Sequence, residues 1–315
     1  MDSISGHKIP VSAIIPTCNR LNALKKTLKS VSQQCAQPVE IIIIDASEND
    51  DTMNLCKYAI TGLLSKLIWY KANEKGAALQ RNQGTELAIS DFILYLDDDI
   101  FLEKNCLEEI WNGIQISPNI GGVGAFVTNQ KYQTPGRVTK FMYRLMSGAK
   151  LESYAGKCIG PAWNIWPEHH KSSKESIQVD WLSTVCVLYR RYILPQPVFP
   201  KIFTGYSYME DVYLSLTVAK TLELHLIPNA EIFHDSQPGD HKKSAFKISK
   251  MQLVNRHFVM RHVMGRKSFK DYSKLFLLEV FFTISHMKKI KNVIPYFGGK
   301  VAGTFDIMTS KKIID

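Results

Sequence analysis

The chain has 315 residues, a formal net charge of +10 and an apolar content of 45%, which is ample for a buried core. Its six cysteines form neither a Cys-x-x-Cys pair nor a Cys/His cluster, which argues against a zinc site and a disulfide framework. No run of about 18 uncharged apolar residues occurs and the start, Met1 to Pro10, is polar, so we expect a cytoplasmic protein with reduced thiols and no membrane-spanning helix.

The first half of the chain alternates predicted strands and helices. Apolar runs predict strands at 11–15, 40–44, 66–70 and 92–96, and helical spacing predicts helices at 21–34 and 76–89. This alternation predicts a parallel sheet with helices on both faces. Ligands bind such sheets beyond the carboxyl ends of the strands, so polar residues there are candidates for a site. These are Thr17, Asn19 and Arg20, then Asp45 and Ser47, then Asp97, Asp98 and Asp99.

The three consecutive aspartates that follow the strand at 92–96 are the most informative feature. Adjacent carboxylates repel one another, and a hard divalent cation among them offsets that cost. Mg²⁺ or Mn²⁺ held by one or two protein carboxylates keeps coordination positions that substrate phosphates commonly fill. A solvated acidic turn before a helix that begins near Glu103 explains the triplet equally well. The triplet alone leaves both interpretations open.

The second half has a less regular pattern. It predicts a helix at 107–116, strands at 122–127 and 179–190, a helix at 210–220, and one or two strands within 223–234. Residues 129–178 lack clear periodicity, and we expect a loop-rich, substrate-facing insert there. After a turn signal at 237–240, long helices are predicted at 242–264 and 270–288. The expected domains are 1–238, with halves 1–128 and 129–238, and a helical region at 239–315.

Six short motifs in this order resemble the family 2 glycosyltransferases, which are inverting enzymes of the GT-A fold that use nucleotide-sugar donors. The motifs are Ile15 to Arg20, Ile43 to Ser47, Lys75 to Asn82, Leu96 to Asp99, Val179 to Leu182, and Met209 to Asp211. More loosely, the tail resembles family members that build bacterial surface polysaccharides. The resemblance implies an α/β, Rossmann-like GT-A fold, with a mostly parallel sheet flanked by helices and a helical C-terminal appendage.

The resemblance also implies a nucleotide-binding role for residues at the strand ends. They are Pro16, Thr17, Asn19, Arg20, Asp45, Ser47, Arg81, Asp97 and Asp98. Asp45 would accept a hydrogen bond from the imide N–H of uracil or thymine, although an Asx turn toward Asn49 is a compatible alternative. Arg81 would act as a fixed cation, and the alternative is an arginine on the surface of a helix.

A metal site is implied at Asp99 and His234. Neutral imidazole is a better ligand for Mn²⁺ than for Mg²⁺, and either ion remains open. A histidine that follows an apolar run is otherwise more often structural, so the order of the motifs is what favours His234 as a ligand.

Asp211 is the implied catalytic base, which removes the proton from the acceptor hydroxyl, and Glu210 would orient it or bind sugar. Partial burial beside another acid raises a carboxyl pKa and makes a better base. The alternative is an acidic first helical turn, favoured by the helix dipole. Asp180 and Trp181 are expected to contact donor or acceptor sugar. Trp163, Trp166 and Tyr206 are further stacking candidates, although large aromatic residues are core residues at least as often.

We therefore expect transfer of a sugar from a UDP-, dTDP- or GDP-sugar to a hydroxyl of a glycan or lipid-linked acceptor, in cell-surface polysaccharide biosynthesis. The apolar stretch Leu275 to Phe282, followed by Lys288, Lys289 and Lys291, predicts peripheral contact with the cytoplasmic face of an anionic membrane. A packed C-terminal helix or a homo-oligomer contact explains that stretch equally well.

Two other function classes share part of this pattern. A nucleotidyltransferase can combine such a sheet with metal-binding aspartates, but Pro16 to Asn19 occupies the place of its Gly-rich phosphate loop. A nucleic-acid-binding protein would explain the positive charge but not the acids at three strand ends, and no recognisable nucleic-acid module or Walker loop occurs. We expect no nucleic-acid partner.

Overall fold

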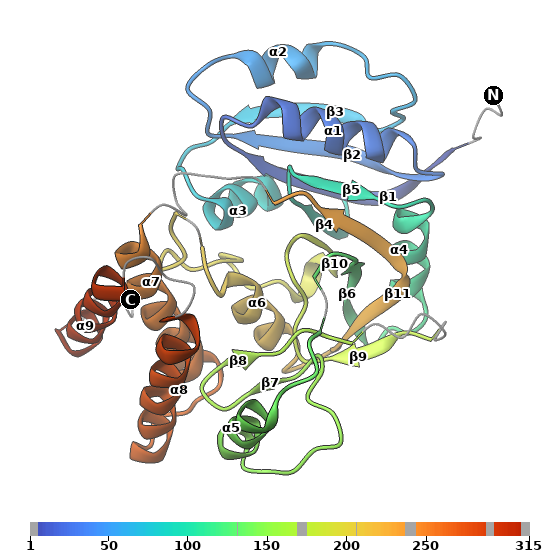
Figure 1. Cartoon of the computed structure of the whole chain (residues 1–315). Coiled ribbons are helices and arrows are strands. Elements are labelled where there is room, and N and C mark those ends of the chain that lie inside the picture. Colours follow the sequence, from blue (N-terminus) through green and yellow to red (C-terminus); the bar gives the residue numbers. More distant parts are fainter. Residues whose placement is uncertain are drawn as a thin grey trace.

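The computed structural model has a central sheet with helices on both faces (Figure 1). The structure describes residues 6–130, 132–168, 175–205, 207–236, 244–287 and 293–309. Within these ranges the main sheet follows the order β3-β2-β1-β4-β10-β6-β11-β5, with β9 paired to β11.

The first half of the sheet is parallel, as the alternating pattern predicts. Its strands are β1 (His7–Thr17), β2 (Ala36–Asp45), β3 (Lys66–Lys71) and β4 (Phe92–Leu96). The β-branched run 41–44 is buried on both faces, which is typical of a central parallel strand. In the register of β1 and β2, Thr17 lies opposite Asp45. The polar residues that follow these strands therefore lie at one edge of the sheet.

Two groups of helices cover the two faces of the sheet. Apolar residues of α1 (Leu21–Ser32), α2 (Asp51–Lys57) and α4 (Cys106–Gln115) pack on one face. Those of α3 (Ala77–Leu87) and α6 (Glu210–Val218) pack on the other. Gly84 permits the close approach of α3, because a Cβ there would lie 2.5 Å from a methyl group of Ile14. The short helix α2 is absent from the sequence prediction.

The second half of the sheet is mixed. β10 (Cys186–Arg190) runs antiparallel between β4 and β6 (Ile120–Val127). β11 (Glu223–His234) is parallel to β6 but antiparallel to β5 (Ile100–Leu102) and β9 (Ile177–Val179). The strand predicted at 179–190 is thus two strands with an irregular segment between them. The direction of β10 reverses because the chain enters it from the insert, at the carboxyl end of the parallel strands.

The predicted loop-rich insert contains a helix and a small hairpin. They are α5 (Arg137–Ser147), β7 (Cys158–Ile159) and β8 (Trp163–Asn164). The helix has a sequence signal, since Val138, Phe141, Met142 and Leu145 follow helical spacing. The expectation of a loop-rich insert without clear periodicity therefore missed the helix at 137–147.

In the described residues after 244, the C-terminal region forms three helices beside the sheet domain. They are α7 (Ala245–Phe258), continued by a π-helical turn (Val259–Val263), then α8 (Phe269–Met287) and α9 (Val293–Thr309). The sequence prediction missed α9, where glycines lower helix propensity. Gly299 is needed there, because a Cβ would lie 2.0 Å from Ser249 Oγ of α7. The predicted turn at 237–240 lies outside the described residues.

These helices are not detached from the sheet domain. Val259 and Val263 belong to the core beneath α6, and Leu278 of α8 packs with the insert. A domain boundary near residue 238 therefore stays a prediction. In the described part of the chain, none of the helices combines the length and apolarity that crossing a bilayer requires.

Candidate active site

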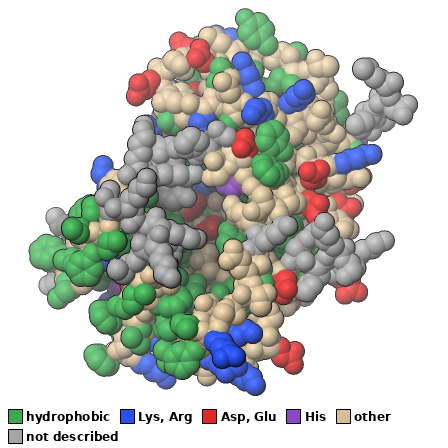
Figure 2. Space-filling view, viewed as in Figure 1, with side chains coloured by type: hydrophobic (Ala, Val, Ile, Leu, Met, Phe, Trp, Pro, Cys, Tyr) green, Lys and Arg blue, Asp and Glu red, His purple; other side chains and the backbone are tan. Residues whose placement is uncertain are grey.

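A cavity of about 1090 Å³ lies beyond the carboxyl ends of β1 and β4. Its walls come from these strand ends, the N-terminal ends of α3 and α6, the insert, and helices α7 and α8. Figure 2 shows this hollow with acidic side chains and a histidine within it. Most of the site residues predicted from the sequence line it: Pro16, Thr17, Asn19, Arg20, Arg81, Asp97, Asp98, Asp99, Trp181, Glu210, Asp211 and His234.

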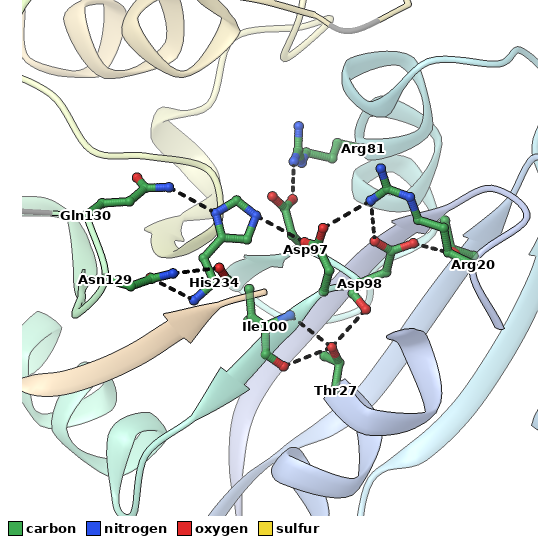
Figure 3. Close-up of polar contacts among 11 residues, drawn as sticks. Arg20, Thr27, Arg81, Asp97, Asp98, Ile100, Asn129, Gln130 and His234 are labelled. Carbon is green, nitrogen blue, oxygen red and sulfur yellow. Dashed lines mark hydrogen bonds and ion pairs between the residues drawn. The ribbon is translucent and has the colours of Figure 1, made fainter. Parts of the chain in front are cut away.

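Asp98 is the deepest of the three aspartates and has polar partners on both carboxylate oxygens. Thr17 Oγ1 donates to Oδ2 at 2.6 Å, and Arg20 Nη1 donates to Oδ1 at 3.1 Å. Burial raises its pKa to about 6, although the Thr17 hydrogen bond and the Arg20 charge oppose the rise. The Thr27 hydroxyl joins the backbone of Asp98 and Ile100 and fixes the turn (Figure 3). A solvated acidic turn does not describe Asp98 and Asp99, which are both buried.

Asp97, Asp99 and His234 bring three potential metal ligands together. One ligand atom from each lies within 4.8 Å of the others. His234 Nε2 is 3.1 Å from Asp99 Oδ1. Two carboxylates and an imidazole form a donor set that suits Mn²⁺, so the residues fit a divalent cation. Asp99 and His234 are the two ligands predicted from the sequence, and the structure adds Asp97 to them.

Two arginines hold the outer carboxylates. Arg81 Nη2 donates to Asp97 Oδ1 at 2.6 Å, and Arg20 Nη1 donates to Asp99 Oδ2 at 3.2 Å. The Arg81 side chain is 3% exposed, which excludes the alternative of an arginine on a helix surface. Its Nε has no hydrogen-bond partner in the described structure. Arg81 therefore places a buried positive charge beside Asp97.

His234 is held by two residues that the sequence analysis did not single out. It ends β11 opposite Ile100, and the Asn129 side chain bonds both its N–H and its carbonyl. Gln130 Nε2 lies 3.2 Å from His234 Nδ1 (Figure 3). Both residues follow the strand predicted at 122–127, so the rule of polar residues after strands would have indicated them.

Glu210 and Asp211 lie at the first turn of α6, on another wall of the same cavity. Arg81 Nη1 is 3.4 Å from Glu210 Oε1, and Thr184 Oγ1 donates to the same oxygen at 3.3 Å. Burial and the neighbouring Asp211 raise the pKa of Glu210 to about 8. Burial raises the pKa of Asp211 to about 6. A carboxyl with such a pKa is suited to accept a proton near neutral pH.

Asp45 and Ser47 lie beneath the cavity rather than in its wall. Asp45 is fully buried; its Oδ1 accepts from Ser47 N and Oγ, and its Oδ2 from Trp69 Nε1. Ser47 Oγ in turn accepts from the backbone N–H of Asn19 at 2.7 Å. The Asx turn therefore forms, and it closes on Ser47 rather than toward Asn49. The pair supports the loop that carries Asn19.

The tryptophans of the second half form an aromatic end of the cavity. Trp181 is 2% exposed, donates from Nε1 to the Ile165 carbonyl, and meets Trp166 edge-on at 5.0 Å. Trp163, Trp166 and Phe282 line the same end. Asp180 lines no part of the cavity and accepts hydrogen bonds from Lys157 Nζ and Cys158 N. The predicted stacking residue Tyr206 lies outside the described residues.

Comparison with known sequences identifies one family over much of the chain. The family described as Glycosyl transferase family 2 matches residues 12–196. TarP of Staphylococcus aureus, a poly(ribitol-phosphate) beta-N-acetylglucosaminyltransferase, is 34% identical over 106 residues, which are 32% of this chain and 32% of that protein. The glycosyltransferase GlyG of Streptococcus pneumoniae is 24% identical over 105 residues, which are 33% of this chain and 35% of that protein. The match spans about a third of each relative.

Solved structures share the fold over most of the chain. A mannosyltransferase from Pyrobaculum calidifontis, in complex with GDP-Man and Mn²⁺, covers 97% of this chain and 89% of its own at 13% identity, with a TM-score of 0.55. The transferase GalNAc-T7, with UDP, GalNAc and Mn²⁺, covers 88% of this chain and 57% of its own at 16% identity, also with a TM-score of 0.55. The predicted GT-A fold is confirmed.

Proposed function

The chain belongs to glycosyl transferase family 2, and from that premise we propose that it transfers a sugar from a nucleoside-diphosphate sugar to an acceptor hydroxyl with inversion at the anomeric carbon. One observation carries the proposal. The carboxylate and imidazole group of Asp97, Asp99 and His234 shares one cavity with the Glu210–Asp211 pair. Leaving-group stabilisation and base catalysis need such groups on different walls of one cavity.

The donor nucleotide is assigned to the strand-end wall. Thr17, Asn19 and Arg20 would contact the base and ribose, and Arg81 would reach the diphosphate as a fixed cation. Asp97 and Asp98 would lie beside the ribose, and Pro16 would shape the same wall. Asp45 and Ser47 would act through the Asn19 loop that they hold. The two structural neighbours, solved with GDP-Man or UDP, support a nucleotide ligand.

Mn²⁺ or Mg²⁺ is the proposed cofactor, with Asp97, Asp99 and His234 as its protein ligands. Bound there, the cation would stabilise the negative charge that develops on the departing nucleoside diphosphate. Both structural neighbours contain Mn²⁺, which supports this choice.

Asp211 is the proposed base that takes the proton from the acceptor hydroxyl. Its pKa of about 6 leaves it largely ionised at neutral pH and still basic enough to accept a proton. Glu210, held by Thr184 and Arg81, would position it. Attack by the acceptor oxygen breaks the bond to the phosphate in one displacement, so the anomeric configuration inverts without a covalent enzyme intermediate. Trp181, and Asp180 through its contacts with the insert, would support the sugar end.

The proposed acceptor is a glycan or lipid-linked hydroxyl, in cell-surface polysaccharide biosynthesis at the cytoplasmic side of the membrane. The name of TarP, a poly(ribitol-phosphate) beta-N-acetylglucosaminyltransferase, supports a polymer as the acceptor. The aromatic end of the cavity supports a sugar acceptor, because aromatic side chains stack on sugar faces.

A donor screen tests this function before the acceptor is known. We expect one of the UDP-, dTDP- or GDP-sugars to raise the melting temperature in a Mn²⁺-dependent way and to release nucleoside diphosphate slowly by hydrolysis. Asp99→Ala should abolish the Mn²⁺-dependent part of the stabilisation. Asp50→Ala, which alters an exposed acid outside the cavity, should not. Absence of stabilisation and release with every donor would contradict the proposal.

A further inference from the structure

Helix α9 exposes an entirely apolar stripe. Ile294, Phe297, Val301, Phe305 and Met308 follow one another at spacings of three or four residues, and each is at least 55% exposed. That spacing aligns them on one face of a helix. The opposite face packs tightly on α7 through Gly299 and Gly303. A helix packed on one side ordinarily presents polar residues to water on the other, so among the described residues this stripe lacks a partner.

Helix α8 carries a similar stripe and also reaches the cavity. Phe276, Val280 and Ile284 are exposed at a spacing of four residues. On the other side of the helix, Leu278 packs in the insert and Phe282 lines the cavity. One helix therefore connects an exposed apolar surface with the aromatic end of the candidate active site.

Helix α5 of the insert extends the surface and contributes positive charge. Val138, Phe141 and Leu145 are exposed on it, interleaved with the exposed Lys140 and Arg144. Arg144 and Lys150 line a shallow depression together with Lys270 and Lys274 of α8. Figure 2 shows hydrophobic side chains gathered over α8 and α9, with basic side chains beside them. The apolar surface thus has a basic margin.

We propose that the exposed stripes of α5, α8 and α9, with this basic margin, dock the protein on an anionic phospholipid membrane. Apolar side chains would enter the boundary between headgroups and acyl chains, while the lysines and arginines pair with lipid phosphates. A second copy of the chain suits the surface less well, because a twofold contact would bring the basic margins together. Docking would place the aromatic end of the cavity near the bilayer, where a lipid-linked acceptor resides. That last point rests on the proposed function.

Vesicle co-sedimentation of the whole chain, without donor or acceptor, tests the docking surface. We expect binding to vesicles of phosphatidylcholine mixed with phosphatidylglycerol, and much weaker binding to phosphatidylcholine alone. The double variant Val301→Glu/Phe305→Glu should lose this binding. Lys140→Glu/Lys270→Glu should weaken vesicle binding about tenfold or more, since each basic residue near an anionic surface contributes substantially to the free energy of binding.

A matched control uses exposed apolar residues elsewhere. Ile89→Glu/Ile116→Glu alters side chains that are 76% and 65% exposed, far from α8 and α9 in the chain, and should bind as the wild type does. Circular dichroism checks that every variant is folded. Equal binding by all variants would overturn the proposal. A second result would also overturn it: the wild type does not bind the vesicles, and light scattering shows that it is a dimer which Val301→Glu/Phe305→Glu dissociates. Donor hydrolysis in solution should be unchanged in these variants, so the two proposals fail separately.

Discussion

Two buried clusters of charge in this molecule differ in how completely they are neutralised. The strand-end cluster contains the carboxylates of Asp97, Asp98, Asp99, Glu210 and Asp211. Arg20 and Arg81 pair with the first four of them, and His234 lies 3.1 Å from Asp99. The helix cluster contains one carboxylate, Glu279, between Arg256 and Lys300. The first cluster has more carboxylates than cations, and the second has the reverse.

The helix cluster joins the three C-terminal helices. Arg256 of α7 pairs with Glu279 of α8 at 3.1 Å, and Lys300 of α9 pairs with the other oxygen of that carboxylate. Arg256 also donates to the Ala162 carbonyl and lies over the Phe282 ring. Each charge therefore has its partners inside the protein, which is typical of a structural role.

The strand-end cluster is incomplete by comparison. Burial and mutual repulsion raise the pKa of several of its carboxyls, which means that the folded protein disfavours their ionised forms. A bound cation would relieve that strain. The difference teaches that buried carboxylates in excess of their cations indicate a site for a cation, whereas a buried carboxylate paired on both oxygens indicates architecture.

The largest expected effect tests the functional half of this comparison. Asp211→Asn should lower the transfer rate about 1000-fold, because general-base catalysis supplies about that factor. Donor affinity, measured by calorimetry, should remain unchanged, because Asp211 makes no ion pair with the arginines in the described structure. Glu86→Gln, an exposed change on α3, is the control. Near-normal transfer by the Asp211 variant would refute the base assignment.

The structural half is tested by Glu279→Gln. Removing the shared carboxylate leaves Arg256 and Lys300 without their buried counter-ion, and we expect unfolding free energy to fall by about 3 kcal/mol. Asp306→Asn is a matched control, because the Asp306–Lys250 pair also joins α9 to α7 but is 35% exposed. It should cost less than about 1 kcal/mol. Urea unfolding measures both, and equal losses would argue against the distinction.

The strand-end cluster could be predicted from the sequence, whereas the helix cluster could not. Thr17 and Asp97 to Asp99 each follow an apolar run directly, and the geometry of parallel strands brings such ends together. In contrast, Glu279 lies inside an apolar stretch, and Lys300 follows two glycines, whose low helix propensity made α9 difficult to predict. Their proximity depends on helix packing, which local pattern does not encode.

The contacts of individual site residues could not be predicted from the sequence pattern either. The sequence indicated Asp45 as a strand-end acid but not that Trp69 and Ser47 occupy both its oxygens. It likewise placed Asp180 beside Trp181 without indicating that the two side chains point to different surroundings. Neighbouring residues in an irregular segment have no fixed periodicity, so the side that each faces is decided by tertiary contacts.

The pH dependence of stability should separate the two clusters further. Because the pKa of Glu210 rises from 4.5 to about 8 on folding, the folded state retains a proton that the unfolded state releases between those pH values. Stability should therefore fall as pH rises through this window, because only the folded state keeps this proton. Glu210→Gln should flatten the fall, and so should Mn²⁺. Urea unfolding across the window, with EDTA or Mn²⁺, measures this. A wild-type profile that Glu210→Gln leaves unchanged would contradict it.

The smallest expected effect concerns Gln130, which would influence metal binding at the strand-end cluster through its contact with His234. A metal on His234 Nε2 requires the ring proton on Nδ1, and that proton then needs an acceptor. Gln130 Nε2 lies 3.2 Å from Nδ1, while Gln130 Oε1 is buried without a hydrogen-bond partner in the described structure. A half-turn of the amide would bring Oε1 to that proton.

Gln130→Ala should therefore weaken Mn²⁺ binding about tenfold, the usual scale for losing such a support. Gln130→Glu, which keeps an acceptor oxygen, should bind Mn²⁺ at least as tightly as the wild type. The exposed change Gln178→Ala on β9 serves as the control. Mn²⁺ titration followed by electron paramagnetic resonance gives the affinities without donor. If Gln130→Ala binds as the wild type does, His234 either needs no such support or is not a ligand, and Asp97 and Asp99 would hold the cation alone.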